Sequence, residues 1–221
     1  MRKISAVLAV VLACAGSALA AKPPKGGTPN PNLSIASSSP SVVFGHSVTI
    51  SGTLKGGAAG TGIQLQQNPY PYNGFKNAGK NASVNPDGTY AISGVVPDKH
   101  TQYRVQAQTK PSSVSGTVFV RVRLAVTFKV SDATPKRGQR VTFSGTAAPE
   151  HDGKAVLIQK RTSTGRYRTL ARTVLLDDGT KDSKWSKGMR IRSNGRFHIV
   201  VDSGDSDHDD GTSSSRRLRV H

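Results

Sequence analysis

Alternating apolar and polar residues form the dominant pattern along this chain. Hydrophobic side chains recur at every second position over Val118–Arg123, Val126–Val130 and Phe197–Val201. Such alternation places one set of side chains in a core and the other in water, as in a half-buried antiparallel strand. Turn-forming pairs such as Asp87-Gly88 and Asn194-Gly195 separate these runs. The pattern therefore predicts an all-β protein.

The chain contains an internal repeat. Gly45–Thr53 matches Gly138–Thr146 at six of nine positions, and the same offset of 93 residues aligns Gln66 with Gln159. Solenoid repeats are much shorter, so this period indicates the duplication of a whole domain.

Beyond this region the two copies are expected to differ. We align Asp87–Ile92 with Ser193–Ile199, which requires an insertion in the second copy that contains Trp185–Arg192. The second copy then lacks a counterpart of Tyr103–Gln108 and carries the acidic segment Asp202–Asp210 instead. This alignment leaves the strand pairing at the end of the second copy open.

The repeat and the composition divide the chain into four expected parts. These are a signal peptide (1–20), a Pro/Gly-rich linker (21–32), domain 1 (33–123) and domain 2 (124–221). The run from Val118 to Val130 is nearly continuous strand, with no flexible linker between the domains. A last strand that passes directly into the next domain predicts a semi-rigid rod.

The first 20 residues have the pattern of an export signal. Arg2 and Lys3 precede an apolar stretch, and Ala18-Leu19-Ala20 has the small residues that signal peptidase accepts. A second interpretation is a lipoprotein signal, because Val11–Cys14 resembles the segment in which a bacterial cysteine receives lipid. The protein is thus expected to be secreted or held in the cell envelope, and to bind the membrane only if Cys14 is lipidated. Since Cys14 is the only cysteine, the domains form no disulfide.

Several elements together resemble a known group of domains. They are the Gly-x-x-Val-Thr-(Ile/Phe)-Ser-Gly-Thr element, the following strand that ends in Gln, the Asp/Asn-Gly turn before Tyr90 or Phe197, and Tyr103–Val105. They are similar to the tandem immunoglobulin-like repeats of exported bacterial surface proteins, in the actinobacterial style. The resemblance covers about residues 33–221 and implies two tandem immunoglobulin-like antiparallel β-sandwiches after the signal peptide.

Charge is the strongest indication of a partner. The chain has 31 Lys and Arg against 13 Asp and Glu, a formal net charge of +18, and eleven of the cations lie within Lys160–Arg196. If they share one sheet face of domain 2, they would attract anionic envelope polymers such as teichoic acid, lipopolysaccharide or acidic glycan. The alternative is a charged outer face without a ligand. Nucleic acid is not expected as a partner of an exported protein. The candidate polyanion-binding residues are Lys160, Arg161, Arg166, Arg168, Arg172, Arg190 and Arg192.

The segment Asp202–Gly211 is a candidate calcium loop. Asp205, Asp207 and Asp209 recur at alternate positions, as do oxygen ligands in loops that wrap a hard cation. The EF-hand motif itself fails, because Asp210 and Arg216 stand where that motif has glycine and glutamate. The alternative is that neighbouring arginines of domain 2 neutralise the loop. No other cofactor is expected.

Catalytic motifs are missing from the sequence. It has no Gly-x-Ser-x-Gly element, no His-Glu-x-x-His element and no phosphate-binding loop, and its six histidines are scattered without ligand spacing. Each histidine is therefore expected at the surface, and no enzymatic activity is expected. The expected function is that of a non-catalytic cell-envelope protein, an immunoglobulin-like binding or spacer module that contacts anionic polymers or surface proteins. The alternatives are a polymer binder that uses the basic face of domain 2 and a calcium-stabilised adhesin module.

Overall fold

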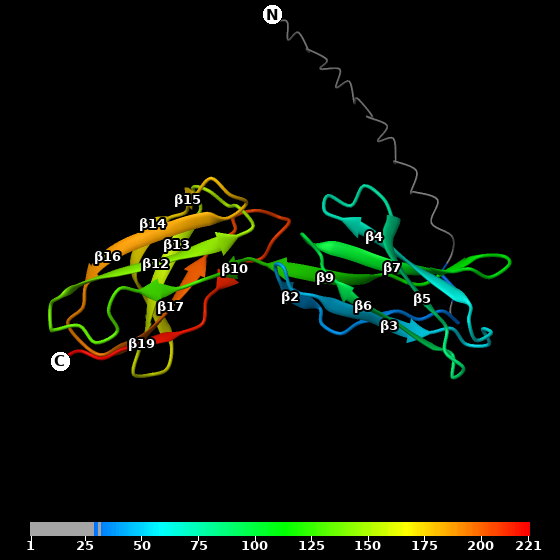
Figure 1. Cartoon of the computed structure of the whole chain (residues 1–221), viewed down its shortest axis with the longest axis horizontal. Coiled ribbons are helices and arrows are strands. Elements are labelled where there is room, and N and C mark those ends of the chain that lie inside the picture. Colours follow the sequence, from blue (N-terminus) through cyan, green and yellow to red (C-terminus); the bar gives the residue numbers. More distant parts are fainter. Residues whose placement is uncertain (1–28, 31) are drawn as a thin grey trace, which may run out of the picture.

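The computed structural model describes residues 29–30 and 32–221. The expected signal peptide, most of the Pro/Gly-rich linker and Cys14 lie outside the described residues. Every regular element in the described part of the chain is a β-strand. No helix there is long and apolar enough to cross a membrane. Figure 1 shows two β-sandwiches that lie end to end and are joined by the segment between β9 and β10.

Domain 1 is an immunoglobulin-like sandwich of two sheets. One sheet has the order β1 (Ala36–Ser37), β3 (Val48–Thr53), β6 (Thr89–Val95). The other has the order β2 (Ser41–Val43), β9 (Val118–Arg123), β7 (Thr101–Ala107), β4 (Gly62–Pro69), β5 (Lys76–Ser83), with β8 (Ser113–Val114) beside β7. β2 pairs in parallel with β9, and the other pairs are antiparallel. β1 and β2 follow each other in the chain but lie in different sheets. The core of domain 1 lies between these two sheets.

Domain 2 repeats this arrangement. One sheet has the order β10 (Ala125–Val126), β12 (Arg140–Ala148), β16 (Ser183–Arg190), β15 (Leu176–Asp177), with β11 (Lys129–Val130) also on β12. The other has the order β14 (Tyr167–Val174), β13 (Ala155–Arg161), β17 (Gly195–Val201), β18 (Gly211–Thr212), with β19 (Arg216–Leu218) also on β17. The prediction of an all-β chain with two immunoglobulin-like sandwiches is therefore confirmed.

Each sandwich has its own hydrophobic core. The buried cluster of domain 1 runs from Leu33 to Val122, and that of domain 2 runs from Leu124 to Leu218. The alternating strands supply these residues, because their apolar positions face inward and their polar positions face water. Aromatic rings pack together within the core of domain 2: the Phe143 ring contacts Phe128 and Phe197, at centroid distances of 5.6 and 5.4 Å.

The structure corrects the alignment of the later part of the repeat. β6 and β16 occupy the same place, each beside the strand that carries the Ser-Gly-Thr element. Tyr90 of β6 lies opposite Gly52, and Trp185 of β16 lies opposite Gly145. Trp185 is therefore the counterpart of Tyr90, at an offset of 95, and no insertion containing it is needed.

A serine contact confirms this new alignment. The amide N–H of Val105 in β7 donates to Ser115 Oγ, and the amide N–H of Ile199 in β17 donates to Ser213 Oγ, both at 3.0 Å. β17 is thus the counterpart of β7, at an offset of 94, and the missing counterpart of Tyr103–Gln108 is found. The alignment of the two copies by sequence was wrong here because turns of the form Asp/Asn-Gly occur before more than one strand.

The two glycines opposite the aromatic residues have a packing role. A Cβ atom at Gly145 would collide with the carbonyl oxygen of Thr127 and would reach Trp185 Nε1 at 3.0 Å. Gly52 has the equivalent collision with Ser34. By contrast, a Cβ atom at Gly188, on the neighbouring strand β16, would meet only the end of the flexible Arg140 side chain.

We predict that Gly145→Ala destabilises domain 2 by about 1–3 kcal/mol, because the backbone of Thr127 must move away. The matched variant Gly188→Ala is expected to change stability by less than about 0.5 kcal/mol, since the arginine side chain can turn aside. Denaturant unfolding followed by fluorescence of Trp185, the single tryptophan, reports on domain 2. Equal stability of the two variants would contradict this packing role.

Candidate functional site

The acidic segment Asp202–Asp210 connects β17 to β18 and lies against domain 1. In Figure 1 it is the orange-red loop that extends toward domain 1 beside β10. The amide N–H of Asp209 donates to the Val122 carbonyl at 2.7 Å, and the amide N–H of Leu124 donates to the Asp209 carbonyl at 3.1 Å. The loop therefore pairs with the segment that crosses between the domains.

A third backbone hydrogen bond reaches farther into domain 1. The amide N–H of His100 donates to the Asp207 carbonyl at 2.8 Å. Lys99 Nζ lies 3.5 Å from an Asp207 carboxylate oxygen, and Arg121 forms an ion pair with Asp209. The Lys and Arg side chains paired with Asp207 and Asp209 thus come from domain 1, whereas Lys154 of domain 2 donates to the Gly204 carbonyl of the loop at 3.1 Å. This corrects the alternative that arginines of domain 2 would neutralise it.

His100 is held as a neutral ring at this junction. Its Nδ1 accepts the amide N–H of Val122 at 2.9 Å, so the hydrogen of the neutral ring is on Nε2. That nitrogen faces Asp209 Oδ1 at 3.5 Å. Burial lowers the pKa of His100 below its ordinary value, with a further lowering by Arg121, although Asp209 acts in the opposite direction. Protonation would break the hydrogen bond to Val122.

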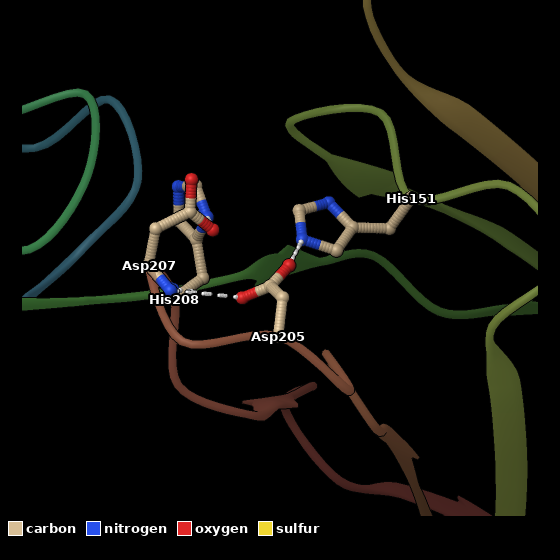
Figure 2. A group of neighbouring side chains, drawn as sticks. All are labelled: His151, Asp205, Asp207 and His208. Atoms are coloured by element: carbon tan, nitrogen blue, oxygen red, sulfur yellow. Dashed lines mark hydrogen bonds and ion pairs between the residues drawn. The ribbon is translucent and has the colours of Figure 1, made fainter. Parts of the chain in front are cut away.

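Next to this contact, two histidines and two aspartates form a compact group that we call the junction cluster (His151, Asp205, Asp207 and His208). Each residue offers one ligand atom, and the four atoms lie within 4.8 Å of one another. His151 Nε2 lies 2.6 Å from Asp205 Oδ2, and His208 Nδ1 lies 2.9 Å from Asp207 Oδ1. Figure 2 shows Asp205 between the His151 ring and the Asp207–His208 pair.

Local turns position these side chains. Asp205 Oδ1 accepts the amide N–H groups of Asp207 and His208, at 3.2 and 2.9 Å, which folds the loop around this carboxylate. His151 lies between β12 and β13, and its amide N–H donates to Ser183 Oγ at 2.8 Å. The cluster thus joins two connections that are distant in the sequence of domain 2.

The two histidine rings are buried, with 6% of each side chain exposed, whereas the two carboxylates remain 25–30% exposed. Each ring also contacts a backbone carbonyl: His151 Nδ1 lies 2.9 Å from Pro149 O, and His208 Nε2 lies 2.8 Å from Asp98 O in domain 1. Because a carbonyl oxygen only accepts hydrogen bonds, these nitrogens carry the hydrogens.

Asp207 is stabilised in its charged form. Burial raises the pKa of Asp207, but the neighbouring side chains of Asp205, His208 and Lys99 together lower it below its ordinary value. A charged carboxylate beside two imidazole rings can hold a proton or a metal ion. The junction cluster is therefore one of two groups in the described part of the chain with the donor atoms of a cation site, and the other is the exposed group Glu150, Asp152 and Asp177.

The structure places the expected calcium ligands differently from the sequence analysis. Asp205 and Asp207 come together, but Asp209 faces Arg121 and His100 of domain 1. The expectation that every histidine lies at the surface is wrong, because His100, His151 and His208 are buried. Sequence reasoning missed His151 because it is 54 residues from Asp205. The signal available was an aspartate directly beside His151 and on both sides of His208.

The predicted polyanion-binding residues do not all share one sheet face. Arg190 lies on β16, opposite Arg140, in a different sheet from β13 and β14. Lys160 Nζ lies 2.8 Å from Ser193 Oγ and 5.7 Å from the Phe197 ring centroid. Arg166 precedes β14, Arg168 and Arg172 lie on β14, and Arg192 lies between β16 and β17. The expected continuous face is thus divided between two sheets.

A smaller basic surface remains on the sheet that contains β13 and β17. Arg161, Arg196 and Arg217 line one pocket there, with Thr162, Ser163, Gly165, Asn194 and Gly195. His198 lies on β17 in the same sheet. Its ring stacks on the Tyr167 ring with the centroids 3.6 Å apart, and its Nε2 lies 2.8 Å from Gln159 Oε1. Only Arg161 of these pocket cations was among the predicted residues.

Comparison with known proteins assigns the chain to no family. No protein-family model and no curated protein matches it. Among solved structures, red sea bream transglutaminase has 9% identity and a TM-score of 0.41, covering 86% of this chain and 31% of that chain. A tetra-tandem repeat from the extending region of a large adhesion protein has 16% identity and a TM-score of 0.33, covering 82% and 48%. Murine CEACAM1b has 13% identity and a TM-score of 0.32, covering 86% and 100%.

The transglutaminase match corrects one expectation of the sequence analysis. The expectation that the chain has no enzymatic activity is contradicted, because an enzyme is among the matched structures. Since this chain spans about a third of the transglutaminase and about half of the adhesion repeat, neither match transfers an activity or a partner. The fold, two tandem immunoglobulin-like β-sandwiches, follows from the strand order of the sheets.

Proposed function

We propose that this chain is an exported bacterial cell-envelope protein whose two sandwiches form a binding or spacer module with a fixed junction. The observation that carries the proposal is the backbone pairing of Asp209 with Val122 and Leu124. Two hydrogen bonds to one crossing segment restrict both bending and twisting between the domains. A flexible tether would leave the same backbone groups in water.

The arrangement of the two ends supports a spacer. In Figure 1 the C-terminus lies at the end of domain 2 that is farther from domain 1. The β7–β9 connection lies at the end of domain 1 that is farther from domain 2. Asn30 donates its amide N–H to Val114 O in that connection, at 2.8 Å. The described chain therefore enters at one end of the rod and leaves at the other. Export, which rests on the leader residues 1–20, is part of the same proposal.

We expect that replacing Asp205–Asp209 by Gly-Ser-Gly-Ser-Gly frees the two domains to reorient, because the loop loses its ion pairs and its ordered turn. Residual dipolar couplings of backbone amides are the measurement: the natural chain should give one alignment tensor for both domains, and the loop variant two. Each domain should keep its own chemical shifts away from the junction.

The matched control is the double variant Arg123→Ala, Asp202→Ala. Both side chains are exposed near the junction, and neither forms an ion pair in the described part of the chain. This control should keep one alignment tensor. Two independent tensors for the natural chain would contradict the proposed fixed junction.

Binding of anionic envelope polymer is a second candidate, favoured by the pocket between Arg161, Arg196 and Arg217. Three guanidinium groups around polar loop residues can hold phosphate or carboxylate groups of teichoic acid, lipopolysaccharide or acidic glycan. Calcium stabilisation of an adhesin module through Asp205, Asp207 and Asp209 stays a prediction, with Asp209 paired to Arg121 in the structure.

We predict that the chain is retained on immobilised teichoic acid and that salt weakens this retention, because binding releases counterions. Arg161→Ala with Arg217→Ala should lower the salt needed for elution. Arg140→Ala with Arg190→Ala removes the same charge from the other sheet and should have the smaller effect. Equal effects of the two double variants would indicate attraction by net charge alone and would contradict a site at the pocket.

A further inference from the structure

We propose that the junction cluster binds one divalent cation of the zinc type through His151, Asp205, Asp207 and His208. Binding depends only on these four side chains. The role that we give to the ion, bracing the contact between the sandwiches, rests on the proposed fixed junction.

The donor set fits such an ion. Zinc is bound by imidazole nitrogen and carboxylate oxygen, mostly with four ligands in a tetrahedron. At bond lengths of 2.0–2.2 Å, neighbouring ligand atoms in a tetrahedron are about 3.3–3.6 Å apart. The four atoms of the junction cluster lie within 4.8 Å, and the two closest His–Asp pairs are at 2.6 and 2.9 Å. Small side-chain movements would therefore equalise these distances around an ion.

The hydrogen bonds of the two rings point to a missing positive charge. His151 contacts a carbonyl oxygen with Nδ1 and a carboxylate with Nε2, while His208 contacts a carbonyl oxygen with Nε2 and a carboxylate with Nδ1. A neutral imidazole has only one N–H group. With that hydrogen directed to the carbonyl, the second nitrogen of each ring faces a carboxylate with only a lone pair. Each of the two buried rings thus directs a lone pair at a carboxylate, and a cation held among the four groups would satisfy both contacts.

The surrounding contacts hold the rings as metal-binding histidines are commonly held. Such histidines donate their other N–H group to a backbone carbonyl or a carboxylate, which fixes the ring and the position of its hydrogen. Pro149 O and Asp98 O accept these bonds here. Asp205 Oδ1 is occupied by two amide N–H groups, so Oδ2 is the oxygen left to face His151.

Zinc suits the cluster better than calcium. Calcium takes six to eight oxygen ligands, whereas two of the four donors here are nitrogen. Because the carbonyl that holds His208 belongs to Asp98 of domain 1, an ion on His208 would also stabilise the contact between the sandwiches.

The test uses the full chain without a histidine tag, with Cys14→Ser in every sample so that the thiol binds no metal. After removal of metal by a chelator, Zn²⁺ is titrated by calorimetry and Co²⁺ by visible absorption. We expect one equivalent of Zn²⁺, a tetrahedral Co²⁺ spectrum that Zn²⁺ abolishes, and no displacement by Ca²⁺. His151→Ala should weaken Zn²⁺ binding by about 100-fold or more.

Two further variants guard against loss of folding and against binding elsewhere. Asp205→Asn keeps an oxygen for the amide N–H groups but loses the charge, so it should fold and still bind Zn²⁺ more weakly. His198→Ala removes a histidine outside the cluster, and Asp177→Asn removes a member of the exposed group Glu150, Asp152 and Asp177. Both control variants should keep the natural affinity.

The outcomes separate the two proposals. Absence of saturable Zn²⁺ binding, or an affinity that His151→Ala leaves unchanged, overturns the cation site; the two His–Asp pairs would then be held by protonated rings. One alignment tensor without Zn²⁺ binding leaves the fixed junction standing. Zn²⁺ binding by a chain whose domains still reorient leaves the site standing and overturns the fixed junction.

Discussion

The backbone pairing of Asp209 with the crossing segment determines how the two sandwiches are placed. Val122 is the last buried residue of one core and Leu124 the first of the next, so the chain passes between cores within two residues. A loop from the second core returns and pairs with this short segment from the side. The crossing strand thereby gains a neighbour where an isolated strand would expose its amide and carbonyl groups. The ion pair of Arg121 with Asp209 and the contact of His208 with Asp98 depend on that pairing.

The same pairing explains the distribution of charge. The chain is strongly basic, yet five of its thirteen acidic residues lie within Asp202–Asp210. Two of them, Asp207 and Asp209, pair with Lys99 and Arg121 and so complement the positive charge of domain 1. Exposed ion pairs contribute little to stability individually, about 0–1 kcal/mol. Their value here is in orientation, because they favour one placement of the loop over others.

The two domains show what a duplicated sandwich retains and what it changes. Each keeps a glycine opposite a large aromatic residue and a serine that accepts an amide N–H of the central strand. These contacts are internal to each core, so each copy needs them. The acidic loop of domain 2 takes the place of residues 108–112, which connect β7 to β8 in domain 1 and contain no acidic residue. Divergence is thus concentrated in the connection that faces the other domain.

Much of the fold could be read from the sequence, because strand alternation and turn residues act over short distances. The period of two over Val118–Arg123 predicted β9 and its buried face, and the repeat predicted two similar sandwiches. The later alignment failed because Asp/Asn-Gly turns are local signals that do not specify which strand follows. Only pairing across the sheet identified Trp185 with Tyr90.

The junction cluster could be predicted from the sequence only in part. The sequence by itself determined that Asp205 and Asp207 lie in one acidic loop, since covalent connection keeps close neighbours together. That His151 joins them, that Asp209 faces domain 1, and that the predicted cations divide between two sheets were decided by tertiary structure alone. The physical reason is that strand order and the return of a loop onto another domain depend on packing across the whole molecule.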